Sequence, residues 1–91
     1  MSCFTIQETP LVGLKIIQRT AIGDARGFLS RIFCAEDLAS AGWTWPIAQI
    51  NHTLTKTFGT VRGMHFQFPP RAEAKLVSCL RGAVCDVAVD I

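Results

Sequence analysis

Apolar and polar residues alternate in short runs along most of the chain, and this period of two predicts strands rather than helices. The stretch 60–70 is the most distinctive. We expect it to form an apolar strand that carries Arg62 and His65 and is stopped by Pro69 and Pro70. The same reasoning predicts strands over 11–18, 28–33, 47–54, 74–80 and 83–91, with an irregular or edge segment over 1–10.

Turn residues separate these runs. The sequence from Gly23 to Gly27 has two glycines and an aspartate, which favour tight turns. Lys56–Gly59 and Arg81-Gly82 are expected to turn in the same way. A helix is predicted only over 35–41, where acidic residues begin the run and Gly42 follows it. At least one of the two following tryptophans is expected to be buried.

Short strands at regular spacing with one brief helix predict an all-β fold of the cupin or jelly-roll type, a barrel or sandwich. At 91 residues the chain is expected to form a single domain. Its last strand runs to Ile91 without a turn, leaving an apolar edge. We therefore expect a partial, open barrel over 1–91 that corresponds to the N-terminal portion of a larger fold, or one completed by another chain.

The composition narrows the function classes. A net charge of +2 with scattered basic residues gives no reason to expect nucleic acid as a partner. The apolar runs are too short for a membrane span, and the N-terminus lacks the pattern of a signal peptide. A cytoplasmic location is the expectation. The cysteines at 3, 34, 79 and 85 have no zinc-binding spacing, and we expect reduced, structural thiols.

His65 has two interpretations. A histidine on a half-apolar strand is more often a hydrogen-bonded structural residue than a catalyst, although histidine is also the common general base near neutral pH. Regular alternation places Arg62 and His65 on opposite faces of the strand. A bulge at Gly63 would let both point into one pocket.

Lys75 and Asp86 form a second candidate pair. If Arg81-Gly82 is a two-residue hairpin loop, both side chains share one face as diagonal neighbours. Such a pair is either a structural ion pair or a tuned catalytic pair, and the pattern alone favours the structural alternative.

Several separated motifs together resemble one family. They are Asp24-Ala25-Arg26-Gly27-Phe28, Gln49-Ile50-Asn51-His52, Val61-Arg62-Gly63-Met64-His65-Phe66-Gln67, Ala74-Lys75-Leu76-Val77 and Gly82-Ala83-Val84-Cys85-Asp86-Val87-Ala88-Val89-Asp90. In this order and spacing they look like the first half of a dTDP-4-dehydrorhamnose 3,5-epimerase, a cupin-type enzyme of sugar-nucleotide metabolism. The resemblance covers nearly all of the chain from Leu11 onward.

The resemblance implies an isomerase that epimerises a dTDP-4-keto-6-deoxyhexose by removing a proton beside the C4 ketone. His65 would be the base, Lys75 would hold the C4 oxygen, and Asp86 would position one of them. The expected substrate-binding residues are Arg26 at the diphosphate, Phe28 against the base, Gln49 and Asn51 at the sugar, and Arg62 as a further positive charge. A homodimer formed by strand exchange would also be expected.

The resemblance implies no metal and no cofactor. Metal-binding cupins use a His-x-His pair, and the residue two beyond His65 is Gln67. The chain has Arg31 where the family usually has Glu, which would alter a nucleotide contact. The family's general-acid Tyr, a carboxylate and a second His lie beyond the position of Ile91, and the chain has no Tyr. The alternative function is therefore a non-catalytic nucleotide-sugar-binding or subunit-pairing module.

Overall fold

The computed structural model describes residues 4–91, so Cys3 lies outside the described residues. The chain divides into two compact units. Unit 1 comprises Met1–Pro46 with Cys85–Ile91, and unit 2 comprises Ile47–Val84. The single domain expected over 1–91 stays a prediction.

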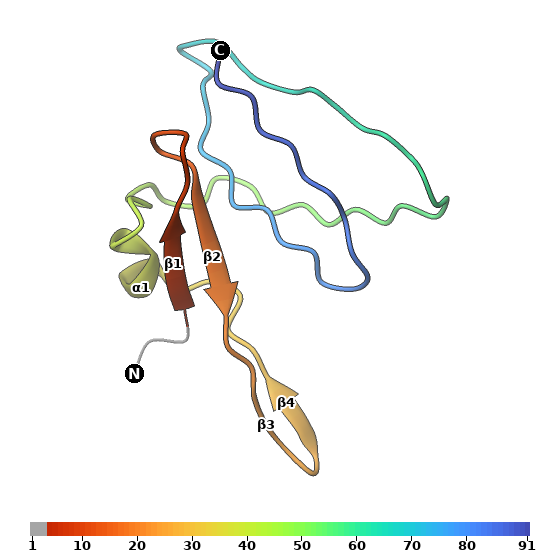
Figure 1. Ribbon diagram of the computed structural model, residues 1–91. Coiled ribbons are helices and arrows are strands. Elements are labelled where there is room, and N and C mark those ends of the chain that lie inside the picture. The colour runs from red at the N-terminus through yellow and green to blue at the C-terminus, as the bar shows by residue number, and fades with distance from the viewer. Residues whose placement is uncertain (1–3) are drawn as a thin grey trace. The chain divides into compact units, whose positions relative to one another are not determined.

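Unit 1 begins with an antiparallel hairpin of β1 (Phe4–Glu8) and β2 (Lys15–Arg19) (Figure 1). The sequence predicts an irregular or edge segment over 1–10. Within its described part, β1 is one of the two edges of the sheet that it forms with β2. The strand predicted over 11–18 is wrong at its start, because the chain there turns. The Thr9 hydroxyl donates to the Leu14 carbonyl at 2.9 Å and accepts from the Leu11 N–H at 3.2 Å. These bonds stabilise the turn, and β2 therefore begins only at Lys15.

A second hairpin pairs β3 (Ile22–Asp24) with β4 (Gly27–Leu29). Its two-residue turn at 25–26 lies inside the predicted turn, which is confirmed. The strand predicted over 28–33 is too long. Ile22, the first residue of β3, pairs with Leu29, so the residues after Leu29 have no partner strand.

The helix α1 (Ala35–Ala39) is where the sequence predicts it, but it is shorter than 35–41. Gly42 has a φ of 92°, which glycine adopts without a steric penalty. The Gly42 N–H bonds the Ala39 carbonyl at 3.0 Å and the Trp43 N–H bonds the Leu38 carbonyl at 3.1 Å. This pair of bonds is a Schellman motif, and it ends the helix.

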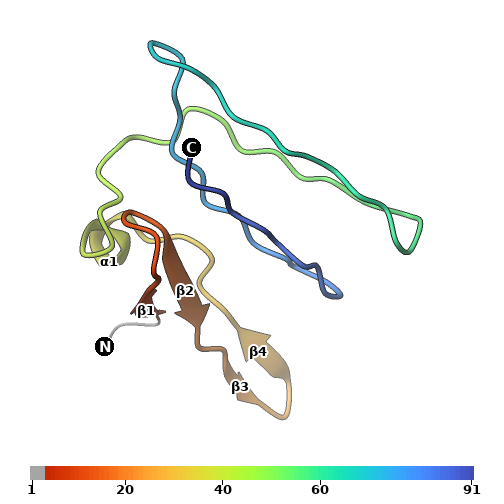
Figure 2. The same cartoon turned by 45° about the horizontal axis from the view of Figure 1, so that its top comes forward.

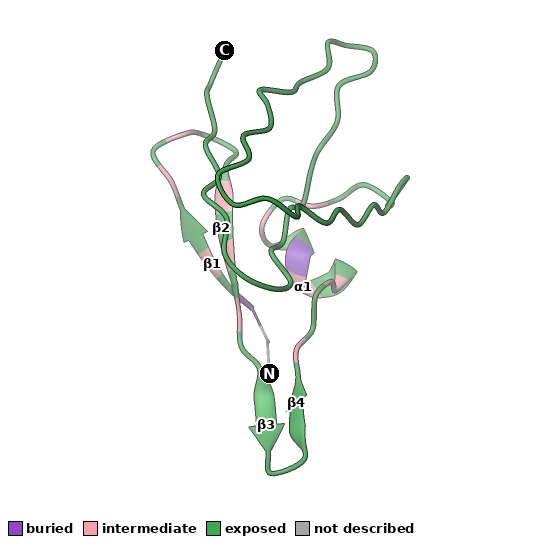
Figure 3. Ribbon diagram, turned by 90° about the vertical axis from the view of Figure 1, so that its right-hand side faces the viewer, coloured by how far each residue is buried: buried purple, intermediate pink, exposed green. Residues whose placement is uncertain are grey.

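The core of the described residues is small and lies in unit 1. Leu38 of α1 is 2% exposed and Phe4 of β1 is 8% exposed (Figure 3). The half-buried Trp43 ring meets Phe33 edge-to-face at 6.3 Å and Trp45 at 5.9 Å. Trp43 is half-buried and Trp45 is exposed, so neither indole is buried to the extent that the sequence predicts.

Residues 47–91 have no assigned strand, so the strands predicted over 47–54, 60–68, 74–80 and 83–91 are wrong for this chain (Figure 2). The turn predicted over Lys56–Gly59 is present, where the Thr60 N–H bonds the Thr57 carbonyl at 3.3 Å. A further turn follows at the two prolines, where the Arg71 N–H bonds the Phe68 carbonyl at 2.8 Å, and Arg81-Gly82 forms a bend. The segments between the turns are extended but lack the regular interstrand hydrogen bonds that define a ladder.

The fold class is nevertheless all-β with one short helix, as predicted. Every assigned element except α1 is a strand. Both sheets are antiparallel and two-stranded, so each remains open.

Candidate functional site

The β3–β4 hairpin carries two of the predicted substrate-binding residues at its exposed tip. Phe28 is 77% exposed, and the Arg26 side chain is 90% exposed. Arg26 Nη2 donates to Asp24 Oδ2 at 2.7 Å, and Arg26 Nε donates to the same oxygen at 3.2 Å. The Asp24 side chain also accepts the Arg26 backbone N–H at 2.9 Å. One carboxylate therefore shapes the turn and holds the guanidinium.

This pairing shifts the pKa of both Asp24 and Arg26. Hydrogen bonds from the Arg26 side chain and backbone lower the pKa of Asp24 from its ordinary value of 3.8. The bond to Asp24 raises the pKa of Arg26. Both groups are therefore charged at neutral pH.

Most of the other predicted site residues lie in unit 2, and all of these are exposed. They are Gln49, Asn51, Arg62, His65 and Lys75. Asp86 belongs to unit 1, together with Arg26 and Phe28. The roles assigned to all of these residues stay predictions.

Gly63 brings the backbone close to the candidate base. Its φ is 128°, in the range that favours glycine, and a Cβ built there would lie 4.0 Å from His65 Nδ1. The imidazole therefore lies near the Gly63 backbone. The placement of Arg62 and His65 in one pocket stays a prediction.

Lys75 has a carboxylate partner, Glu73, that the sequence motifs do not indicate. Its Nζ lies 3.2 Å from Glu73 Oε1, and the two side chains are about half exposed. The signal that could have found it is the spacing of two, which places Glu73 and Lys75 on one face of an extended segment. The predicted pairing of Lys75 with Asp86 stays a prediction.

Unit 2 is strongly cationic. Glu73 is its only acidic residue, against five basic residues. These are Lys56, Arg62, Arg71, Lys75 and Arg81. Of these five, Lys75 alone has an ion-pair partner among residues 4–91. Unit 2 therefore presents uncompensated positive charge, which suits an anionic ligand.

Arg31, where the resemblance leads one to expect Glu, lies against the helix of unit 1. Its Nη1 is 4.0 Å from Asp37 Oδ2 in the first turn of α1. A glutamate at this position would face a like charge. The reversal therefore fits the local surroundings of α1.

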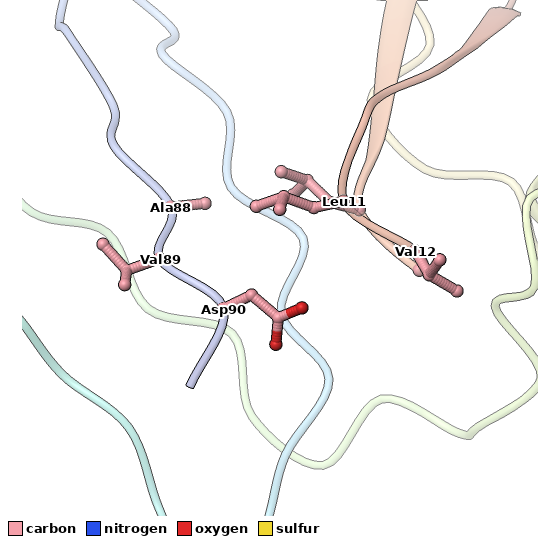
Figure 4. Close-up of a pocket in the computed structure, with 7 residues that line it drawn as sticks. Leu11, Val12, Ala88, Val89 and Asp90 are labelled. Carbon is pink, nitrogen blue, oxygen red and sulfur yellow. The ribbon is translucent and has the colours of Figure 1, made fainter.

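An open pocket of about 260 Å³ lies within unit 1, between the β1–β2 turn and the C-terminal segment (Figure 4). Its lining is mostly apolar, from 11–14 and 88–90, with Asp90 as its one charged residue. None of the predicted site residues lines it. It therefore contributes nothing to the candidate site.

Three further observations concern the described residues. Cys34, Cys79 and Cys85 are free thiols, as predicted for them. Residues 4–91 contain no group of three or more His, Cys, Asp or Glu side chains arranged to hold a metal ion. No helix in this part of the chain has the length and apolar character needed to cross a membrane.

Comparison with known proteins identifies the family. The model of the dTDP-4-dehydrorhamnose 3,5-epimerase family matches residues 8–91. Curated proteins of that name are similar. The relative from Sinorhizobium fredii is 40% identical over 93% of this chain and 44% of its own length. That from Streptomyces griseus is 39% identical over 87% of this chain and 40% of its own length. The relative from Escherichia coli K12 is 37% identical over 92% of this chain and 45% of its own length.

The chain belongs to the dTDP-4-dehydrorhamnose 3,5-epimerase family, as the motifs indicate. It spans less than half the length of these curated relatives. A comparison with solved structures found no match.

Proposed function

We propose that this chain carries the base and the oxyanion-binding group of a sugar-nucleotide epimerase that acts on a dTDP-4-keto-6-deoxyhexose. The observation that supports the proposal is that His65, Lys75 and Arg62 all belong to one cationic unit, which has a single carboxylate. The names of the relatives support the substrate class.

The chemistry requires a base and a cation. His65 removes the proton from the carbon beside the C4 ketone, and the electron pair moves onto the ketone oxygen to form an enolate. The Lys75 ammonium stabilises that oxygen as it becomes negative. Return of a proton to the opposite face of the same carbon regenerates the ketone with inverted configuration. Arg62 adds positive charge, and Asp86 positions Lys75 or His65.

The remaining residues bind the substrate. Gln49 and Asn51 contact the sugar, Arg26 contacts the diphosphate, and Phe28 lies against the thymine. The exposure of the β3–β4 hairpin supports the last two roles, because the Arg26 and Phe28 side chains are both available to a ligand. We further propose that two copies pair by strand exchange and that the protein acts in the cytoplasm.

Proton exchange tests the proposal directly. The chain is incubated with dTDP-4-keto-6-deoxyglucose in deuterated water, and the sugar C3 and C5 positions are followed by NMR. His65→Asn is compared with His52→Asn, since these are the two histidines of the chain. We expect deuterium with the native chain and with His52→Asn, and none with His65→Asn. Exchange that survives His65→Asn would overturn the role of His65.

A second candidate function is a non-catalytic module that binds the sugar nucleotide or pairs subunits. The observation that favours it is the excess of positive charge in unit 2, which would bind an anionic ligand without any proton transfer. The same experiment separates the two functions. Binding of the sugar nucleotide without deuterium incorporation would support the module and contradict the epimerase.

A further inference from the structure

We propose that Asp24 is a positioning residue that orients Arg26 for a diphosphate. The proposal rests on the function above, in which Arg26 contacts the diphosphate of the sugar nucleotide. It adds a residue to which neither the motifs nor the comparisons assign a role. The evidence lies in the geometry of the β3–β4 hairpin.

The two side chains meet along one edge of the guanidinium. Arg26 Nε lies 3.3 Å and 3.2 Å from the two oxygens of Asp24, and Nη2 lies 2.7 Å from Oδ2. The edge formed by Nε and Nη2 is therefore occupied. The end formed by the outer hydrogens of Nη1 and Nη2 is left for another acceptor. Arginine binds phosphate through two such parallel donors.

The backbone fixes the position of the carboxylate. Asp24 is the last residue of β3 and pairs with Gly27 across the two-residue turn. Its Oδ1 also accepts the Arg26 backbone N–H at 2.9 Å. The carboxylate is thus tied to the turn that carries Arg26. An arginine that is 90% exposed would otherwise sample many rotamers.

The carboxylate has two opposing effects on a bound anion. It repels the anion, and it restricts the guanidinium to one orientation before binding. The repulsion is screened by water because both groups are exposed. Binding to a flexible side chain loses affinity through ordering, and a pre-oriented side chain loses less. We therefore expect orientation to prevail and Asp24 to favour binding.

The test is a mutant cycle read by calorimetric binding of dTDP and of inorganic pyrophosphate. Asp24→Asn keeps an oxygen for the Arg26 backbone N–H but removes the charge that holds the guanidinium. We expect it to weaken the binding of both probes about threefold, the scale of an exposed charge pair. Arg26→Ala should weaken both at least roughly tenfold. In the Arg26→Ala background, Asp24→Asn should cause no further loss.

A matched control comes from the β1–β2 hairpin. Glu8 forms an exposed ion pair with Lys15, so Glu8→Gln makes the same change in net charge away from the tip of β3–β4. It should leave both affinities unchanged. Circular dichroism of each variant checks that the fold is kept.

The outcomes separate this inference from the proposed function. Full binding by Asp24→Asn would show that the side chain only shapes the turn, and an equal loss in the Arg26→Ala background would show that it acts independently of Arg26. Tighter binding by Asp24→Asn would show that repulsion prevails. Each of these overturns the inference alone. An Arg26→Ala variant that binds normally, or a native chain that binds neither probe, overturns the role of Arg26 in the proposed function as well.

Discussion

The two units of this chain differ in how their apolar residues are used. Unit 1 has two paired hairpins, a helix and both buried apolar residues, Phe4 and Leu38. In unit 2 no residue is buried, and Val61 and Ile50 are 92% and 83% exposed. Both units contain apolar alternation of the kind that predicts strands. The difference teaches that alternation makes a segment capable of pairing, whereas a covered face and a hydrogen-bonded neighbour make it a strand.

The units also differ in charge. Unit 1 contains the ion pairs Glu8–Lys15, Asp24–Arg26 and Asp37–Arg31, and its acidic residues outnumber its basic residues. Unit 2 has one carboxylate for five cations. The unit that lacks a core is thus the one with a net positive charge. This is the expected arrangement if its side chains serve a ligand more than a local fold.

The largest predicted effect is that of Leu38→Ala, which removes a side chain that is 2% exposed in unit 1. We expect a loss of about 2 kcal/mol in the free energy of unfolding, the low end for a buried leucine, because the core is small and can relax around the change. Urea unfolding followed by tryptophan fluorescence measures it. The matched variant in unit 2, Leu54→Ala, should change stability by less than about 0.5 kcal/mol, since Leu54 is 74% exposed. Equal losses of stability in Leu38→Ala and Leu54→Ala would contradict the difference in burial between the two units.

Amide hydrogen exchange compares the backbones of the two units. The paired amides of β1 and β2 should exchange at least about tenfold more slowly than those of 61–68, because only the former are in a ladder. Mass spectrometry of peptic fragments or NMR would provide the rates. Comparable protection in 61–68 would show that unit 2 forms a ladder in solution.

A smaller effect is expected where the helix ends. Gly42→Ala places a Cβ on a residue with a φ of 92°. The strain should cost about 1 kcal/mol of stability and fray α1. Thermal unfolding by circular dichroism measures it, with Ser40→Ala as the control two residues earlier, where the φ is −68°. A neutral Gly42→Ala would mean that the Schellman motif is not required.

The smallest effect concerns the pH dependence of the β3–β4 hairpin. Because the pKa of Asp24 is lowered in the folded chain, its contribution to stability is present above the ordinary value of 3.8 and is lost as the pH falls through the folded value. An NMR titration of the Asp24 carboxyl should therefore give a pKa below 3.8. In Arg26→Ala the pKa should rise towards that value. An unchanged pKa in this variant would mean that Arg26 is not the cause.

The sequence predicts some features of the candidate site, and only the structure shows others. The sequence motifs are sufficient to identify the family and to nominate His65, Lys75 and Arg26. They did not indicate that Glu73 pairs with Lys75, or that Asp24 holds the guanidinium of Arg26. Both carboxylates lie two residues from their partners. Spacing gives such pairs only as one possibility among several, since a side chain has many rotamers and the structure selects one.

The sequence by itself determined the turns at Gly23–Gly27 and Lys56–Gly59, the position of α1 and the family. These depend on local preferences: glycine at positive φ, aspartate in a turn, acidic residues at a helix start. Pairing within each hairpin set where β2 begins and where β4 ends, and tertiary structure alone decided whether the segments of unit 2 become strands. Those outcomes depend on which backbone groups find a partner and which apolar faces are covered. Partners and covering layers come from residues distant in the chain, so a local pattern cannot specify them.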